Sequence, residues 1–137
     1  MNIIVPMAGA GSRFEKAGYT FPKPLIEVKG QPMIAKVVEN LELQGKYIFL
    51  VQKAHYEKYD LINLLNLIAP GCEIVQIDGL TEGAACTVLK ARELINNDQP
   101  LVISNSDQWI RWNSFETISS FNNEDGGILT FKSVHPK

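Results

Sequence analysis

Short apolar runs alternate along this chain with segments of helical periodicity, and this alternation restricts the possible folds more than any other feature. Five runs predict strands: residues 2–6, 47–51, 73–77, 100–104 and 127–132. Strands separated by helices pair in parallel through right-handed crossovers, and strands that are apolar on both sides fit a sheet covered on both faces. The sequence therefore predicts an α/β fold, a three-layer, Rossmann-like and mostly parallel sheet with helices on both faces.

The segments between the strands carry helix signals. Pro32 suits the first turn of a helix whose apolar residues share one face, and Gly45 marks its end. Three further helices are predicted at residues 55–68, 82–95 and 112–122.

The composition is that of one ordinary globular domain. Of the 137 residues, 45% are hydrophobic and 20% are charged. The net charge of −2 gives no positive surface for nucleic acid, so we expect no nucleic-acid partner. No apolar run approaches the ~20 residues of a membrane helix, and no signal peptide precedes the first strand. We therefore expect a cytoplasmic protein without membrane contact, in which Cys72 and Cys86 are reduced thiols.

The chain stops at Lys137, directly after the last predicted strand and without a closing helix. We expect residues 1–137 to form a single nucleotide-binding α/β domain, the N-terminal part of a longer catalytic domain that is truncated here on its C-terminal side. An exposed edge of such a short sheet would allow a homo-oligomer to form by edge pairing.

A glycine-rich loop follows the first strand, and its residues are Ala8, Gly9, Ala10, Gly11, Ser12 and Arg13. Glycines leave backbone N–H groups uncovered, and such groups beside a cation suit a chain of phosphates. The loop is not a dinucleotide fingerprint, because Phe14 stands where a third small residue is needed. It also lacks the Gly-Lys-Ser/Thr of a Walker A loop. We therefore expect it to bind a nucleoside triphosphate (NTP).

Lys23 stands between two prolines, Pro22 and Pro24, which fix the backbone on both sides of it. Such stiffening makes sense if the ammonium group must meet a phosphate at a set place. Arg13 and Lys23 would then neutralise the charge that builds up as a phosphate is attacked. Two aromatic residues, Tyr19 and Phe21, lie between Arg13 and Lys23 in the sequence. They could form a lid over the phosphates or anchor the loop, and both interpretations stay open.

Together these motifs resemble a known family. Gly-x-Gly-Ser-Arg at 9–13, Pro-Lys-Pro-Leu at 22–25 and Val-Lys-Gly-Gln-Pro-Met-Ile at 28–34 are similar to the N-terminal half of the nucleotidyltransferases that activate sugar phosphates. That fold also includes the cytidylyltransferases of polysaccharide and isoprenoid pathways, and the resemblance extends along the whole chain. It implies the nucleotide-diphospho-sugar transferase type of sheet. It also implies that the glycine loop wraps the nucleotide, that Arg13 contacts the triphosphate, and that Lys23 touches the α-phosphate or the acceptor phosphate.

The segment Thr81-Glu82-Gly83 begins the third predicted helix, and the resemblance implies that it packs on the nucleobase. Gly83 would let the backbone reach the edge of the base. Glu82 departs from the glutamine often found there in the family. A carboxylate can accept from the amino group of cytosine, which favours CTP over UTP. The alternative is that Thr81 and Glu82 only cap the helix.

A carboxylate, Asp107, follows the fourth predicted strand in the segment Asn105-Ser106-Asp107. This segment and the glycine loop should meet where strand order reverses, which is where ligands bind in such folds. The resemblance implies that Asp107 binds Mg²⁺, and a carboxylate there suits a hard cation held against phosphate oxygens. Ser106 replaces the glycine usual in the family. A second metal ligand is expected beyond Lys137, because Asp125 comes too early in the chain.

The resulting hypothesis is an enzyme that joins an NTP to a phosphorylated sugar or a related metabolite and releases pyrophosphate. Arg13 and Lys23 would be catalytic, and Mg²⁺ the cofactor. Two alternatives stay open. A glycosyltransferase would use a sugar nucleotide, although Asn105 stands where its Asp-x-Asp motif has a first carboxylate. A non-catalytic module would only sense nucleotides.

Overall fold

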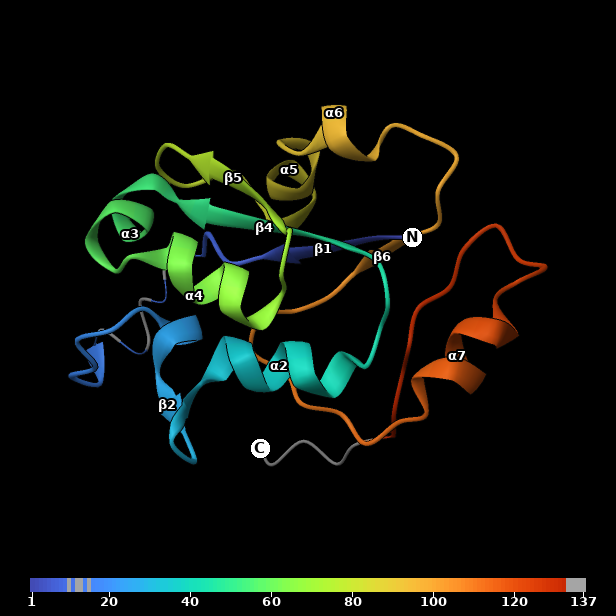
Figure 1. The fold of residues 1–137 in the computed structure, drawn as a ribbon, viewed down its shortest axis with the longest axis horizontal. Coiled ribbons are helices and arrows are strands. Elements are labelled where there is room, and N and C mark those ends of the chain that lie inside the picture. Colours follow the sequence, from blue (N-terminus) through green and yellow to red (C-terminus); the bar gives the residue numbers. More distant parts are fainter. Residues whose placement is uncertain (10, 12–13, 15, 133–137) are drawn as a thin grey trace.

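The chain folds around a four-stranded parallel sheet in the computed structural model, which describes residues 1–9, 11, 14 and 16–132 (Figure 1). The spatial order is β5-β4-β1-β6. These strands are β1 (Asn2–Pro6), β4 (Lys46–Gln52), β5 (Glu73–Ile77) and β6 (Leu101–Ile103). Ile4 of β1 pairs with Ile48 on one side and with Ile103 on the other. Four of the five predicted strands and their parallel pairing are therefore confirmed.

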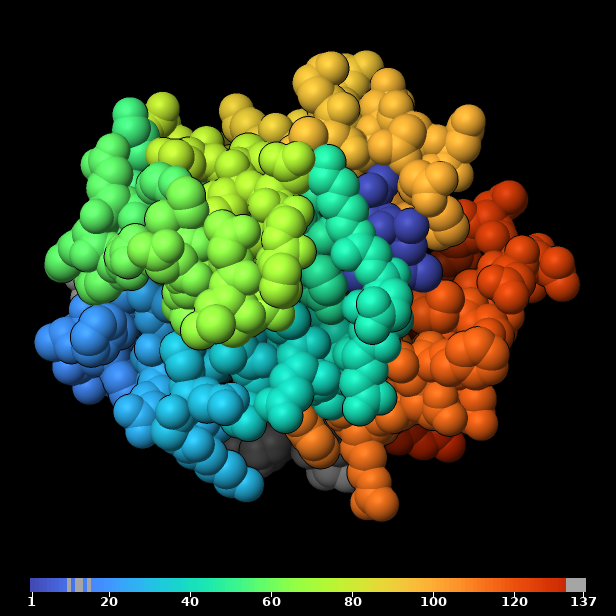
Figure 2. All heavy atoms as spheres, in the orientation of Figure 1, coloured from blue at the N-terminus to red at the C-terminus, as the bar shows by residue number. Residues whose placement is uncertain are grey.

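Helices cover both faces of this sheet, which confirms the predicted three layers (Figure 1). One face packs against α2 (Met33–Leu41), α3 (Lys53–Lys58) and α4 (Leu61–Ile68). The other face packs against α5 (Ala84–Leu89) and α6 (Arg92–Ile95). Figure 2 shows the molecule from the side of α2 and α4, whose blue-green and green atoms lie in front of much of the sheet.

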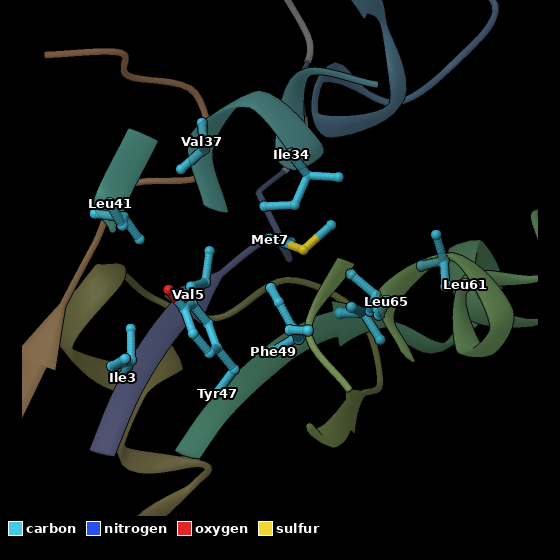
Figure 3. Close-up of a cluster of buried hydrophobic side chains, with 12 residues drawn as sticks. Ile3, Val5, Met7, Ile34, Val37, Leu41, Tyr47, Phe49, Leu61 and Leu65 are labelled. Atoms are coloured by element: carbon cyan, nitrogen blue, oxygen red, sulfur yellow. The ribbon is translucent and has the colours of Figure 1, made fainter. Parts of the chain in front are cut away.

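The core explains why the strands are apolar on both sides. Figure 3 shows Val5 and Phe49 of the sheet pointing toward Ile34 of α2 and Leu65 of α4, and all four side chains are fully buried. The alternate residues on the same strands point to the other face, where Leu50 packs in a second cluster with residues of α5. Each fully buried aliphatic side chain contributes about 1.5–3 kcal/mol to folding.

A small antiparallel hairpin lies before α2 and was not predicted. It consists of β2 (Glu27–Val28) and β3 (Gln31–Pro32). Lys29 and Gly30 connect them with φ values of 52° and 80°, as a tight two-residue turn with two left-handed positions requires. Gly30 was the sequence signal for this turn.

The first helix ends earlier than predicted. It stops at Leu41, because Glu42 takes a left-handed conformation with φ 50°. Gly45 was wrongly predicted as the stop. It lies instead beside the N-terminus of the chain, where a Cβ would come within 2.6 Å of the Met1 carbonyl oxygen. Close backbone approach, not helix termination, accounts for this glycine.

Two predicted helices are each broken into two. The segment 55–68 divides into α3 and α4 because Asp60 is left-handed, with φ 48°, and its carboxylate accepts a hydrogen bond from Asn63 Nδ2. The segment 82–95 divides into α5 and α6 where the amide of Ala91 bonds to Val88, one residue nearer than in an α-helix. The buried side chain of Ala91 packs against the sheet at this point.

The last helix is confirmed and the last strand is not. Helix α7 (Ser114–Ser120) begins where the Asn113 side chain accepts a hydrogen bond from the amide of Glu116. The strand predicted at 127–132 is wrong: these residues pair with no strand of the described sheets, and Ile128 is 86% exposed. Strand propensity alone does not form a strand without a partner edge.

Neither cysteine forms a disulfide: Cys72 and Cys86 are both half-buried free thiols. Burial raises the pKa of the Cys72 thiol, which keeps it protonated and unreactive at neutral pH. Across the ranges that the structure describes, the helices are all too short or too polar to pass through a lipid bilayer.

Candidate nucleotide site

A pocket of about 870 Å³ lies at the carboxyl ends of β1 and β6. Three segments line it: the start of the glycine loop, the turn before α5 together with that helix, and the residues that follow β6. Strand order reverses here, because β4 and β6 flank β1 on opposite sides. The predicted meeting of the glycine loop with the Asp107 segment is confirmed.

The described part of the glycine loop contributes directly to the pocket. Ala8 is buried and Gly9 is exposed, and both line it. Gly11 is left-handed, with φ 60°, so a side chain there would be strained. A Cβ on Gly11 would lie 3.9 Å from the backbone nitrogen of Lys23, so the two motifs are neighbours. The other predicted loop residues, Ala10, Ser12 and Arg13, lie outside the described residues.

Lys23 and Asp107 form an ion pair across 84 positions of sequence. Lys23 begins a short 3-10 helix, η1 (Lys23–Leu25), which the buried Pro24 fixes against the protein. Its ammonium nitrogen also lies 4.9 Å from the ring centroid of Phe14. The side chains of Lys23 and Asp107 are 33% and 28% exposed, so both charges remain accessible from solvent. The cation predicted to bind phosphate and the carboxylate predicted to bind a metal therefore lie at one place.

Aromatic contacts hold the loop that carries Lys23. Phe14 and Tyr19 pack within the loop, with ring centroids 5.4 Å apart. Phe21 packs on Tyr59 at 5.7 Å, and the Tyr59 hydroxyl donates to the Thr20 carbonyl at 3.3 Å. These contacts are those of an anchor.

The turn before α5 is tied together by hydroxyl groups. The Thr81 and Thr87 hydroxyls contact each other, and both reach the Gly83 carbonyl oxygen. Gly83 occupies the N-cap position in an extended conformation, and no side chain caps the helix there. Thr81 and Gly83 line the pocket, whereas Glu82 is exposed and is not among the lining residues.

A residue that was not predicted, Asn40 of α2, holds the segment after Asp107. Its side chain donates to the Ile110 carbonyl and accepts from the Ile110 amide, both at 2.8 Å. The indole of Trp112 also donates to the Asn40 carbonyl at 2.9 Å. Nothing in the local pattern around Asn40 signalled this role, because the contact spans 70 positions.

A second unpredicted residue, Gln52, bonds to the glycine loop. It is the last residue of β4, and its amide nitrogen donates to the Ala8 carbonyl at 2.9 Å and to the Gly9 carbonyl at 3.4 Å. The sequence offered one signal for this role: Gln52 is a polar residue at the carboxyl end of an apolar strand, the edge where ligands bind in such folds.

Another hollow, of about 840 Å³, lies between α2 and α4. It reaches Gly45 and Tyr47 at the amino end of β4, at the opposite edge of the sheet from Asp107. Its size is similar, but no described residue of the glycine loop, Lys23 or the Asp107 segment is among the residues that line it. The residues that line the two hollows, and not their volumes, therefore identify the pocket at the carboxyl edge as the candidate site.

The donor groups fit one mode of binding a hard cation. The described residues contain no cluster of three or more histidine, cysteine or acidic side chains that could hold a metal by themselves. Asp107 supplies one accessible carboxylate beside the glycine loop. Mg²⁺ is commonly held by one or two carboxylates together with the phosphates of a nucleotide. The site therefore fits a cation shared with phosphate oxygens.

Comparison with known proteins decides the family. A family model described as nucleotidyl transferase matches residues 2–137. The chain belongs to the nucleotidyl transferase family. The bifunctional protein GlmU of Methanococcus maripaludis strain C5 is 32% identical over 98 residues, which cover 72% of this chain and 23% of GlmU. The chain thus spans about a quarter of the length of this curated relative.

Solved structures agree on the fold of this nucleotidyl transferase chain. A UTP-bound UGPase from Acinetobacter baumannii superposes with a TM-score of 0.64 at 20% identity, covering 90% of this chain and 53% of that one. The inositol-1-phosphate CTP transferase from T. maritima gives 0.63 at 16% identity, covering 90% and 49%. The predicted sheet type is therefore confirmed.

Proposed function

We propose that this protein transfers a nucleotidyl group from an NTP to the phosphate of a phosphorylated sugar or a related metabolite, with release of pyrophosphate. The observation that carries the proposal is the meeting of Lys23, Asp107 and the glycine loop at one pocket. Family membership gives the reaction class its support. The acceptor oxygen would attack the α-phosphorus in line, and no covalent enzyme intermediate is needed.

The chain's own residues would act by position and charge. Backbone N–H groups of the glycine loop would hold the triphosphate. Lys23 would leave Asp107 and stabilise the negative charge that develops on the α-phosphate. Arg13 would neutralise the triphosphate beside it. Orientation of two bound reactants can itself supply much of the rate.

Asp107 would hold Mg²⁺ together with phosphate oxygens. When bound, such a cation supplies charge neutralisation and polarises the phosphorus–oxygen bonds. The ion pair would keep this exchange balanced in charge, because Asp107 would give up Lys23 for the cation and Lys23 would give up Asp107 for a phosphate. The two ligands should therefore bind together better than either does alone.

We propose CTP as the preferred nucleotide, and this choice rests on Glu82. Structural relatives differ in the nucleotide for which they are described: one is a UTP-bound UGPase and another is an inositol-1-phosphate CTP transferase. Glu82 is exposed, but both of its sequence neighbours, Thr81 and Gly83, line the pocket where we place the base. Glu82→Gln should lower the CTP to UTP ratio in kcat/KM several-fold. An unchanged ratio would remove the basis for preferring CTP.

The test is a panel of CTP, UTP, dTTP and GTP against several sugar phosphates, with released pyrophosphate as the readout. It should use the complete gene product, because this chain spans about half of the solved relatives. Arg13→Ala and Lys23→Ala should each lower the rate on the order of 10²-fold, as the loss of one preorganised donor does. Pyrophosphate without an acceptor requirement, or near-normal turnover in both variants, would contradict the proposal. Nucleotide binding without turnover would favour the sensing module.

A further inference from the structure

The glycine loop begins where the backbone ladder between β1 and β4 ends. The last of these bonds runs from the Met7 amide to the Leu50 carbonyl at 2.7 Å. Beyond it, the side chain of Gln52 takes over and donates to the carbonyls of Ala8 and Gly9. Gln52 is also the N-cap residue of α3, but its side chain makes no capping bond there. The amide group is therefore committed to the loop.

The direction of these bonds fixes the direction of a neighbouring N–H group. The carbonyl of residue 8 and the amide of residue 9 belong to one trans peptide, so they point in opposite directions. Because the Ala8 carbonyl faces Gln52 on β4, the Gly9 N–H faces away from β4. Strand β6 and the Asp107 pocket lie on that other side of β1.

This peptide needs an external restraint. Gly9 has no Cβ, and a Cβ there would meet nothing within 4 Å, so on its Gly9 side no side chain and no contact at that position limits rotation of the peptide. A rotated peptide would present a carbonyl oxygen to the pocket in place of an N–H group. An oxygen dipole there would repel a phosphate that the N–H group attracts.

We infer that Gln52 is a positioning residue, which holds the Ala8–Gly9 peptide with its N–H directed at the phosphates of the bound nucleotide. This inference rests on the proposed function and adds a residue to it. Gln52 does not touch the reacting atoms. It acts through the loop, so its loss should weaken binding of the phosphate chain and leave the nucleobase contacts unaffected.

Two variants of Gln52 test this in the complete gene product. Gln52→Leu removes the donor at similar size, and Gln52→Glu also turns an acceptor toward the two carbonyls. By calorimetry with inorganic tripolyphosphate, Gln52→Leu should bind about fivefold to tenfold more weakly, the effect of one lost hydrogen bond, and Gln52→Glu more weakly still. The KM for the NTP should rise by a similar factor. Binding of the nucleoside without phosphates should not change.

Gln76 of the adjacent strand β5 provides the matched control. It is exposed, and its side chain makes no hydrogen bond recorded among the described residues. Gln76→Leu and Gln76→Glu carry the same changes in size and charge and should bind tripolyphosphate as the unsubstituted protein does. A general effect of altered charge near the sheet would appear equally in both pairs and would overturn the inference.

A measurement on the unsubstituted protein guards against variants that fail to fold. In protein labelled with ¹⁵N-glycine, the Gly9 amide signal, assigned with Gly9→Ala, should shift on addition of tripolyphosphate. If tripolyphosphate and NTP do not bind at all, the proposed function fails and this inference fails with it. If they bind but Gly9 does not shift, or if Gln52→Leu binds equally well, only the inference on Gln52 is wrong.

Discussion

The ion pair between Lys23 and Asp107 offers the sharpest separation of function from stability. Both side chains are about one third exposed, and an ion pair that is open to solvent contributes only about 0.2–1 kcal/mol. Lys23→Met and Asp107→Asn should therefore each lower the free energy of unfolding by about 1 kcal/mol or less. A domain of ordinary stability, about 5–15 kcal/mol, would remain more than about 99% folded after such a loss.

Activity should respond on a different scale. Each variant should lower pyrophosphate release by about 10²-fold or more, because each removes a charge that acts on the reacting phosphates. Exchanging the charges, with Lys23→Asp and Asp107→Lys in one protein, should restore most of the lost stability and none of the activity. Denaturant titration and steady-state kinetics on the same samples measure both quantities.

The pair between Lys46 and Glu73 is the control, because it joins β4 to β5 with a nitrogen–oxygen distance of 3.2 Å and is also partly exposed. Lys46→Met and Glu73→Gln should change stability as little as the variants of the first pair, while the rate stays normal. The reasoning is refuted if the activity of the Lys23 and Asp107 variants simply follows their folded fraction. It is equally refuted if the charge-exchanged protein regains full turnover.

Three further predictions follow from backbone conformation and burial. Gly83→Ala should leave the melting temperature unchanged, since the backbone is extended with φ 173° and a Cβ would meet nothing within 4 Å. In calorimetry the same variant should bind nucleotide more weakly, and an equal affinity would mean that no base approaches Gly83. Gly11→Ala should cost about 1 kcal/mol in denaturant titration, because φ is 60°; an unchanged midpoint would show that this loop conformation is not required. Burial, and next the charge of Lys58, lower the pKa of His55, so the fold is more stable above the unfolded pKa of about 6.5 and loses this stability as the pH falls below that value. The urea midpoint of His55→Gln should therefore fall less between pH 7.5 and pH 5.5 than that of the unsubstituted protein, and an equal fall would contradict this assignment.

The sheet could be predicted because each central strand must be apolar on both sides, and this pattern is local in the sequence. Val5 and Leu50 illustrate it, since each is buried against a different layer. The helix breaks could not be predicted, because they depend on single left-handed residues such as Asp60, which can also continue a helix. The strand at 127–132 failed for the opposite reason: its composition suits a strand, but no strand partner pairs with it in the described residues.

The candidate site shows the same division. The position of Asp107 followed from topology, because every parallel strand delivers its carboxyl end to the same edge. The direct contact between Lys23 and Asp107 did not follow, since it depends on how a loop of irregular structure folds back over that edge. The support given by Asn40 and Gln52 comes from long-range side-chain contacts with backbone groups, which leave no periodic trace in a sequence.

The location of a bound triphosphate tests the central claim most directly. Crystals of the protein soaked with CTP and Mg²⁺ should show the phosphates between Gly9 and Asp107, with Lys23 turned from the carboxylate to a phosphate oxygen. Density for the nucleotide in the hollow between α2 and α4, or phosphates that leave the Lys23–Asp107 pair intact, would contradict the claim.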